Sequence, residues 1–228
     1  MKRVLALLVL IPVFWRLENQ AEDPIVKPSF FESHQIRLTL VIATGIGTVE
    51  SATVFYPALA VAALGVNEST AAWLMLPSVL AMTIASPLVG KSIYSVGSKF
   101  IVQAGLVLLF IGVLIYGLVP LNVTWFIVGG IIGGTGLAGL LGAPLRFILL
   151  NEANAGDRAA AQGLLTVFLA IGQLLGAAIV GGVAASKGGG VIGYQSAFVV
   201  LATMTAVITV VATALKSKAA ERAAATPP

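Results

Sequence analysis

Two polar side chains stand in the middle of long apolar runs and are the first candidates for chemistry. Glu50 lies in the run of residues 38–64, and Gln173 lies in the run of residues 159–186. A carboxyl group surrounded by hydrocarbon must face the interior of a helix bundle, pair with another group, or take up a proton. Because desolvation penalises the charged form, Glu50 is predicted to bind and release a proton. The alternative is a permanently neutral Glu50 that donates to a backbone carbonyl.

Helical spacing adds two residues to this candidate site. Steps of three and four residues from Glu50 place Gly47 and Thr39 on the same face of a helix. Both are predicted to bind a proton or a substrate together with Glu50. Gln173 is predicted either to hydrogen-bond to another helix or to line a cavity.

Glycine and proline dominate the run of residues 123–145, where two G-x-x-x-G pairs overlap. Small residues at this spacing let a neighbouring helix approach closely, and proline ends or kinks a helix. The alternatives are a purely structural packing role and a deformable helix. The candidates for helix packing or conformational change are Gly129, Gly133, Gly136, Pro144, Gly90 and Gly97.

The elements that carry these residues follow from composition. Hydrophobic residues make up 58% of the chain and charged residues 10%, with a mean hydropathy of +1.03. A soluble domain has about 25% charged residues, so the surrounding solvent must be lipid. About 20 apolar residues cross a bilayer as a helix. The sequence therefore predicts an all-α membrane protein with a six-helix bundle over 38–215, whose spans are 38–64, 70–90, 99–119, 123–145, 159–186 and 194–215.

The remaining segments divide the chain further. Residues 1–15 contain an apolar stretch too short to span, which is predicted to be part of a transmembrane helix. Residues 16–37 are predicted to be a cytoplasmic linker, and 216–228 a disordered cytoplasmic tail. Lys and Arg gather in the loops on one side of the spans, which predicts a multi-pass protein of the cell membrane with its C-terminus inside.

Several functions are excluded or disfavoured by the residues present. The chain has no cysteine and a single histidine, His34, so no Cys- or His-based metal cluster is expected. No G-x-x-x-x-G-K-[ST] motif is present, and the basic residues are scattered singly, which disfavours nucleic acid as a partner. We therefore expect no catalytic residues, no metal and no cofactor.

Four motifs resemble the C-terminal half of major facilitator superfamily transporters, closest to the fourteen-helix drug:proton antiporter branch. They are the linker at 22–31 (EDPIVKPSFF), the loop at 90–99 (GKSIYSVGSK), the glycine-rich run ending at Pro144, and the stretch 157–176 beginning Asp-Arg. The loop keeps the glycines and the last basic residue of the family's G-x-x-x-D-R-x-G-R-[RK] motif. Tyr94 and Ser95 replace its Asp-Arg pair.

This resemblance implies two three-helix inverted repeats, 38–119 and 123–215, whose first helices line a central cavity. It implies a secondary transporter that exports small amphipathic or drug-like molecules in exchange for protons. Its expected partners are the lipid bilayer, the substrate and proton, and an N-terminal half or a second copy that completes the cavity. A six-helix permease driven by a separate ATPase and a non-transporting membrane scaffold remain alternatives. Three alternatives also remain for the chain itself: it is a fragment of a longer transporter, a half-transporter that homodimerises, or an inactive remnant.

Overall fold

The computed structural model describes residues 28–218, and all of its regular structure within that range is helical. The partial helix predicted at 1–15, much of the 16–37 linker and most of the 216–228 tail lie outside the described residues. Six helical spans are long and apolar enough to cross a membrane. They are His34–Leu64, Glu68–Val96, Ser98–Leu118, Val123–Glu152, Ala155–Ser186 and Gly190–Ala214. The prediction of an all-α bundle with six spans is confirmed.

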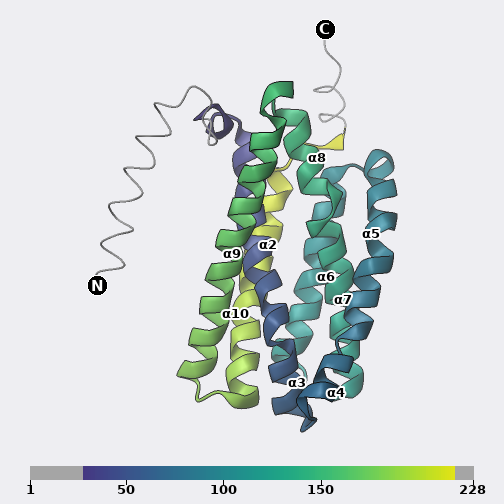
Figure 1. Ribbon diagram of the computed structural model, residues 1–228, viewed down its shortest axis with the longest axis vertical. Helices are drawn as coiled ribbons and strands as arrows, with labels where there is room; N and C mark the ends of the chain where they lie inside the picture. Colours follow the sequence, from purple (N-terminus) through teal and green to yellow (C-terminus); the bar gives the residue numbers. More distant parts are fainter. Residues whose placement is uncertain (1–27, 219–228) are drawn as a thin grey trace, which may run out of the picture.

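The spans stand side by side with their axes roughly along the long dimension of the molecule (Figure 1). Short 3₁₀ helices and kinks divide several of them. In chain order the elements are η1 (Pro28–Phe31), α2 (His34–Glu50), η2 (Ser51–Phe55), α3 (Tyr56–Leu64), α4 (Glu68–Trp73), α5 (Leu76–Val96), α6 (Ser98–Leu118), α7 (Val123–Leu141), α8 (Ala143–Glu152), η3 (Ala155–Asp157), α9 (Arg158–Ser186), α10 (Gly190–Val211) and η4 (Ala212–Ala214).

Two predicted boundaries were wrong. The loop expected at 90–99 is a break at Gly97 alone, and Gly90 lies inside α5. Gly97 has φ +89°, a backbone conformation that residues with a Cβ rarely adopt, so one residue reverses the chain. The fourth span does not end at 145, because after a break at Gly142 it continues to Glu152 as α8, with Pro144 in its first turn. Proline fits there because the first N–H groups of a helix lack intrahelical acceptors.

The first and fourth of the six spans, which begin the two predicted three-helix repeats, are each broken about two-thirds of the way along. In residues 34–64 the break is η2, and in 123–152 it is Gly142. The two spans run in opposite directions, so the breaks lie toward opposite ends of the bundle. This placement agrees with the inverted repeats that the resemblance implies.

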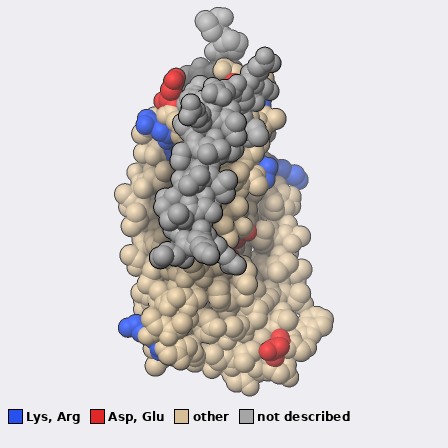
Figure 2. Space-filling model, turned by 60° about the vertical axis from the view of Figure 1, so that its left-hand side comes forward, with Lys and Arg blue, Asp and Glu red and all other residues tan. Residues whose placement is uncertain are grey.

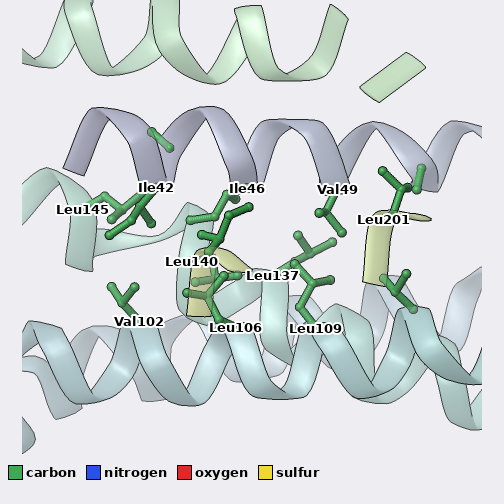
Figure 3. Close-up of a cluster of buried hydrophobic side chains, with 14 of the residues drawn as sticks. Ile42, Ile46, Val49, Val102, Leu106, Leu109, Leu137, Leu140, Leu145 and Leu201 are labelled. Carbon is green, nitrogen blue, oxygen red and sulfur yellow. The ribbon is translucent and has the colours of Figure 1, made fainter. Parts of the chain in front are cut away.

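The core lies between α2 on one side and α6, α7 and α8 on the other. Side chains of α2 such as Ile42 and Ile46 point toward Leu106 and Leu140 (Figure 3), and all four are at most 1% exposed. The other core residues labelled there are Val49, Val102, Leu109, Leu137, Leu145 and Leu201.

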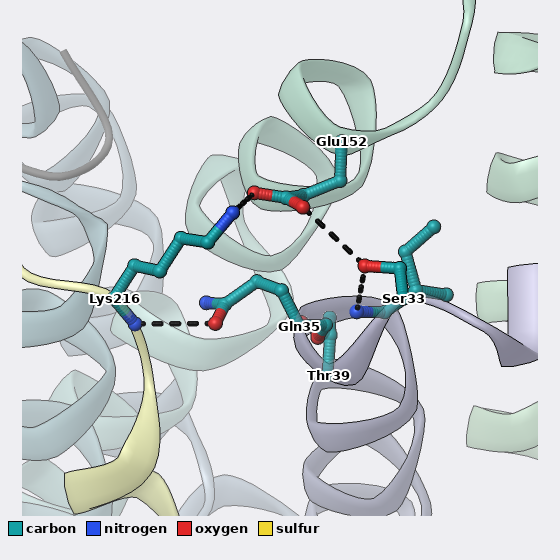
Figure 4. A network of polar contacts seen from close by, with 6 residues as sticks. Ser33, Gln35, Thr39, Glu152 and Lys216 are labelled. Carbon is teal, nitrogen blue, oxygen red and sulfur yellow. Dashed lines mark hydrogen bonds and ion pairs between the residues drawn. The ribbon is translucent and has the colours of Figure 1, made fainter. Parts of the chain in front are cut away.

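Each end of the bundle is fastened by a different kind of contact. At one end, the Glu152 carboxylate pairs with Lys216 Nζ and accepts a 3.3 Å hydrogen bond from Ser33 Oγ (Figure 4). The backbone N–H of Lys216 donates to Gln35 Oε1 at 3.2 Å. These bonds join the start of α2 to the ends of α8 and the sixth span.

At the other end, four rings from α3, α6, α7 and α10 form an aromatic cluster. Tyr116 is its centre, with ring centroids 4.6 Å from Tyr56, 5.3 Å from Phe126 and 5.8 Å from Phe198. The Tyr116 hydroxyl donates to the Phe126 carbonyl at 2.9 Å. The only polar atom of that ring is therefore satisfied inside the cluster.

The two overlapping G-x-x-x-G pairs of α7 face two different helices. A Cβ at Gly129 would lie against Tyr116 of α6, and a Cβ at Gly134 would lie against Ser78 of α5. Gly130 lies between the two, because a Cβ there would meet both the Tyr116 hydroxyl and Ser78. One residue of offset along a helix turns the side chain by about 100°, so a single glycine-rich segment admits two neighbours. Gly136 continues the face toward α6, where a Cβ would lie 2.6 Å from Leu109 N.

Alanine substitutions at two glycines one turn apart in α7 should have different effects on stability. A Cβ at Gly136 collides with α6 backbone atoms, whereas at Gly133 the nearest atom to a Cβ is 3.9 Å away. Overpacking costs about 1–3 kcal/mol, so G136A should lower the thermal unfolding midpoint of the purified protein. G133A should leave it unchanged or raise it, because Gly weakens a helix interior by about 1 kcal/mol relative to Ala. Equal shifts for the two variants would contradict this packing.

Candidate substrate and proton site

The candidate site depends on direct backbone contact between α2 and α9. A Cβ at Gly172 would lie 2.0 Å from the Thr44 carbonyl oxygen, and one at Gly176 would lie 2.0 Å from the Thr48 carbonyl oxygen. From the other helix, a Cβ at Gly47 would lie 2.2 Å from the Leu169 carbonyl oxygen. These three positions therefore require glycine. This close approach brings Glu50, about one turn after Gly47, next to Gln173, which directly follows Gly172.

Helix α2 ends at Glu50, directly before the 3₁₀ segment η2. Pro57 explains the change of geometry, because its nitrogen cannot donate to the carbonyl of Thr53 and its ring crowds that carbonyl. The hydroxyls of Ser51 and Thr53 donate to the carbonyls of Thr48 and Glu50, both at 2.8 Å. Glu50 is thus held at a break within a span rather than in a continuous helix.

Glu50 and Gln173 meet across the two helices. Gln173 Nε2 donates to Glu50 Oε2 at 3.1 Å. The Glu50 side chain is half-buried, and Gln173 is exposed on the surface of the described bundle. The sequence pointed to both residues but left open whether Gln173 bonds across helices or lines a cavity; in the structure it does both.

The pair opens into a cleft of 510 Å³ between η2 and α9. Apart from the acid and the amide, the walls are mainly apolar. The other lining residues are Ser51, Thr53, Val54, Phe55, Ala170, Leu174 and Ala177. Helical spacing from Glu50 predicts Val54 on the same stripe, and sequence reasoning did not select the other six. Ala170 and Ala177 could have been found by stepping three and four residues along α9 from Gln173.

Thr39 and Gly47 share the α2 face with Glu50 but do not reach the cleft. Thr39 is fully buried, and its hydroxyl donates to the Gln35 carbonyl at 2.8 Å. It precedes Glu50 by three helical turns, about 16 Å of rise. Gly47 is covered by the α9 backbone. The structure thus places Thr39 in the core and Gly47 in a helix–helix contact, and only Glu50 of the three lines the cleft.

A second cleft of 490 Å³ continues from the first toward the end of the bundle where α3 and α4 meet. Val54 lines both clefts. The second cleft also contains Glu68 from α4 and Tyr194 from α10. The sequence did not indicate Glu68 as a site residue, because its place beside α10 is set by the tertiary structure.

The arrangement suits reversible proton binding and contact with an amphipathic molecule. A carboxyl group can hold a proton, an amide can donate or accept, and the remaining walls offer apolar surface. Among residues 28–218, no group of three or more His, Cys, Asp or Glu side chains is placed to hold a metal ion.

Much of the molecular surface around these clefts is apolar. On the face shown in Figure 2, most of the visible Lys, Arg, Asp and Glu side chains lie toward the two ends and leave a broad, largely uncharged belt between them. None of the most apolar stretch of the second span is buried, and only 28% of that of the fifth span is. These two spans, which contain α5 and α9, offer the bundle's least covered surfaces.

Cysteine labelling can show that the cleft holds water. The chain has no native cysteine, so E50C and Q173C should each react with a water-soluble maleimide in the membrane-embedded protein. T39C should stay unlabelled because position 39 is fully buried. V207C is the matched control, since Val207 is 59% exposed on α10 but belongs to a membrane span and to neither cleft. Equal labelling at 50 and 207 would contradict an aqueous cleft.

Comparison with known proteins gives the family. The family model described as "Major Facilitator Superfamily" matches residues 38–228. An uncharacterised MFS-type transporter of Bacillus subtilis, YfiU, is 32% identical over 176 residues, which are 75% of this chain and 33% of YfiU. The chain therefore spans about a third of the length of this curated relative. With six helices long and apolar enough to span a membrane among the described residues, and a family match over most of its length, the chain belongs to the major facilitator superfamily of membrane transporters.

Proposed function

We propose that this chain forms half of a proton-coupled exporter of small amphipathic, drug-like molecules, with Glu50 as the proton-binding group. The observation that carries the proposal is the hydrogen bond between Gln173 and Glu50 in an open cleft within two membrane spans. Membership of a transporter superfamily supports transport itself. The proton and the class of substrate rest on the cleft and on the four antiporter-like motifs.

In the ionised state, the Glu50 carboxylate accepts from Gln173 Nε2, and hydrogen bonds to a charged acceptor are stronger than neutral ones. A proton on Glu50 removes the charge and supplies an O–H donor, so the pair must change its hydrogen bonding. A substrate in the same cleft meets the apolar side chains of Val54, Phe55 and Leu174. Protonation and substrate binding therefore compete for the groups that line one space.

The break at η2 supports a moving site. A 3₁₀ segment has poorer hydrogen-bond geometry than an α-helix and often marks a hinge. Glu50 directly precedes η2 and Val54 is part of it. A change of angle between α2 and α3 would shift Val54 relative to Glu50 and Gln173, because Glu50 is the last residue of α2 and the glycine contacts fix Gln173 to that helix.

A second bundle is part of the proposal, either an N-terminal half or a second copy. Lipid cannot solvate the carboxylate of Glu50, and the cleft that holds it is open on the surface of this bundle. The spans containing α5 and α9 leave large apolar surfaces for such a partner. Transport would follow from rocking of the two bundles around the shared cleft.

The proposed orientation places the Glu152–Lys216 end in the cytoplasm of the cell. Basic side chains gather at that end, and they are Arg37, Lys91, Lys99, Arg146, Arg158, Lys216 and Lys218. At the opposite end of the described bundle, Lys187 is the single basic residue. An excess of Lys and Arg on the cytoplasmic side is the usual rule for membrane proteins. Protons entering from outside would then reach Glu50 past Glu68 and Val54.

Replacing Glu50 by Gln should abolish proton-driven transport, because the amide keeps the size of the side chain and cannot carry a proton. Vesicles containing the complete carrier are given a proton gradient, and efflux of a fluorescent amphipathic cation is followed. E50Q should reduce gradient-driven efflux to the level of empty vesicles. Q173L should weaken it through the loss of the hydrogen bond, worth about 1.5–3 kcal/mol when one partner is charged.

The control is E32Q, which removes an exposed carboxylate that precedes α2 and belongs to neither cleft. It should transport like the unmodified carrier. Unchanged efflux in E50Q would refute the role of Glu50 as proton carrier. Efflux that requires ATP and does not depend on the proton gradient would instead favour a permease driven by a separate ATPase. A protein that binds no amphipathic molecule would favour a non-transporting membrane scaffold.

A further inference from the structure

A separate groove of 340 Å³ lies between α5 and α6, with α7 as its floor. It shares no residue with the two clefts along α2, α3 and α9. Leu88, Val96 and Phe100 contribute large apolar side chains to its walls, and each is exposed. Gly105 and Gly139 keep its floor deep, because α6 and α7 approach each other there without side chains.

The polar groups of this groove are not free to bind a polar ligand. Ser92 Oγ donates to the Leu88 carbonyl, and Thr135 Oγ1 donates to the Ile131 carbonyl, each at 2.8 Å. Each hydroxyl is thus engaged within its own helix. The groove offers a hydrocarbon surface along its length, which suits an alkyl chain and not a hydrogen-bonding solute.

Three lysines lie near the residues at this end of the groove, two of them along the chain and one in space. Lys91 directly precedes Ser92 of the groove wall, and Lys99 directly precedes Phe100. Lys218 lies against Gly97, the residue that joins α5 to α6, and its Nζ donates to the Ser95 carbonyl. Lys99 Nζ donates to the Thr213 carbonyl at 2.5 Å. A backbone carbonyl does not neutralise an ammonium group, so Lys99 and Lys218 keep their attraction for an anion.

The length of the groove matches one leaflet of a bilayer. From Ala85 to Val96, both in its wall, α5 rises about 16 Å. The hydrocarbon core of a bilayer is about 30 Å thick, so half of it is about the same length. An apolar trough of this length with a basic end has the polarity pattern of an anionic phospholipid.

We infer that the α5–α6 groove binds one acyl chain of an anionic phospholipid, whose headgroup phosphate is held by the lysines around Gly97. The ligand comes from the leaflet at the Glu152–Lys216 end of the bundle. Lys216 takes no part, because its ammonium group is paired with Glu152. This inference needs only the membrane location and stands or falls independently of Glu50.

The test is native mass spectrometry of the full chain from mixed micelles that contain equal amounts of phosphatidylglycerol and phosphatidylcholine. The unmodified protein should retain phosphatidylglycerol in preference. K91Q/K218Q should lower the retained fraction by roughly fivefold per lysine, since each basic group near an anionic membrane surface is worth about that factor. K187Q, at the opposite end of the bundle, should leave it unchanged.

The groove itself is tested by A104W, which places a large ring among its walls. T83W is the matched control, because Thr83 is exposed on α5 and does not line the groove. Two residues along a helix turn the side chain by about 200°, so position 83 faces away from the groove residue Ala85. A104W should reduce retention of phosphatidylglycerol, and T83W should not. Should A104W fail to fold by circular dichroism, A85W fills the same groove from α5.

The two sets of variants separate the parts of the inference. Loss of retention in the lysine variant alone would overturn the groove as the binding site. Loss in the groove tryptophan variant alone would overturn the headgroup assignment. Equal retention of both lipids by the unmodified protein would overturn the inference as a whole.

Discussion

The contact that everything else in this bundle depends on is the one between the backbones of α2 and α9. In a bilayer, the hydrophobic effect does not press helices together, because lipid tails are as apolar as the side chains. Helices associate through close packing, and the closest packing is between backbones. Gly47, Gly172 and Gly176 supply it, each with a carbonyl oxygen of the other helix where a Cβ would be. Any side chain at these positions would push the helices apart.

The glycine contact also decides what the polar groups can do. It sets Gln173 within hydrogen-bond distance of Glu50, and it does so just where α2 gives way to η2. On the packed side of this point the hydroxyls of Thr44 and Thr48 donate to carbonyls of their own helix, at 3.0 and 2.8 Å. They are therefore satisfied locally. The carboxyl and the amide are left facing each other in the cleft.

Side-chain contacts fix the two ends of the bundle, whereas two of its spans are interrupted between those ends. The Ser33–Glu152–Lys216 contacts fix one end of the bundle, and the rings around Tyr116 fix the other. Between these ends, the first and fourth spans are each broken, at η2 and at Gly142. A bundle with fastened ends and interrupted central helices can adjust its middle, where the cleft lies, without losing its overall packing.

The cleft at Glu50 and the groove between α5 and α6 differ in the solvent that suits them. The cleft at Glu50 contains an ionisable group and an amide and requires water or a ligand. The groove between α5 and α6 has its hydroxyls bonded within their own helices and requires hydrocarbon. Both arise from helices that meet at small residues, and the side chains around the contact determine the difference.

The amino-acid sequence by itself determined the membrane location, the number of spans and the identity of the one ionisable residue in their middle. These follow from the length of apolar runs and from the cost of charge in hydrocarbon, which are local properties of the chain. It also identified Gln173 as the second polar group. It could not show that the two are partners, because they belong to spans far apart in the chain and periodicity describes one helix at a time.

Tertiary structure alone decided which face of each helix is covered. Thr39, Gly47 and Glu50 share a face of α2, yet α9 covers Gly47, the core covers Thr39, and the break at η2 leaves Glu50 open. The glycines of α7 likewise divide between α5 and α6. The sequence showed that these residues permit close approach, but the neighbour that approaches is set by how all six spans pack at once.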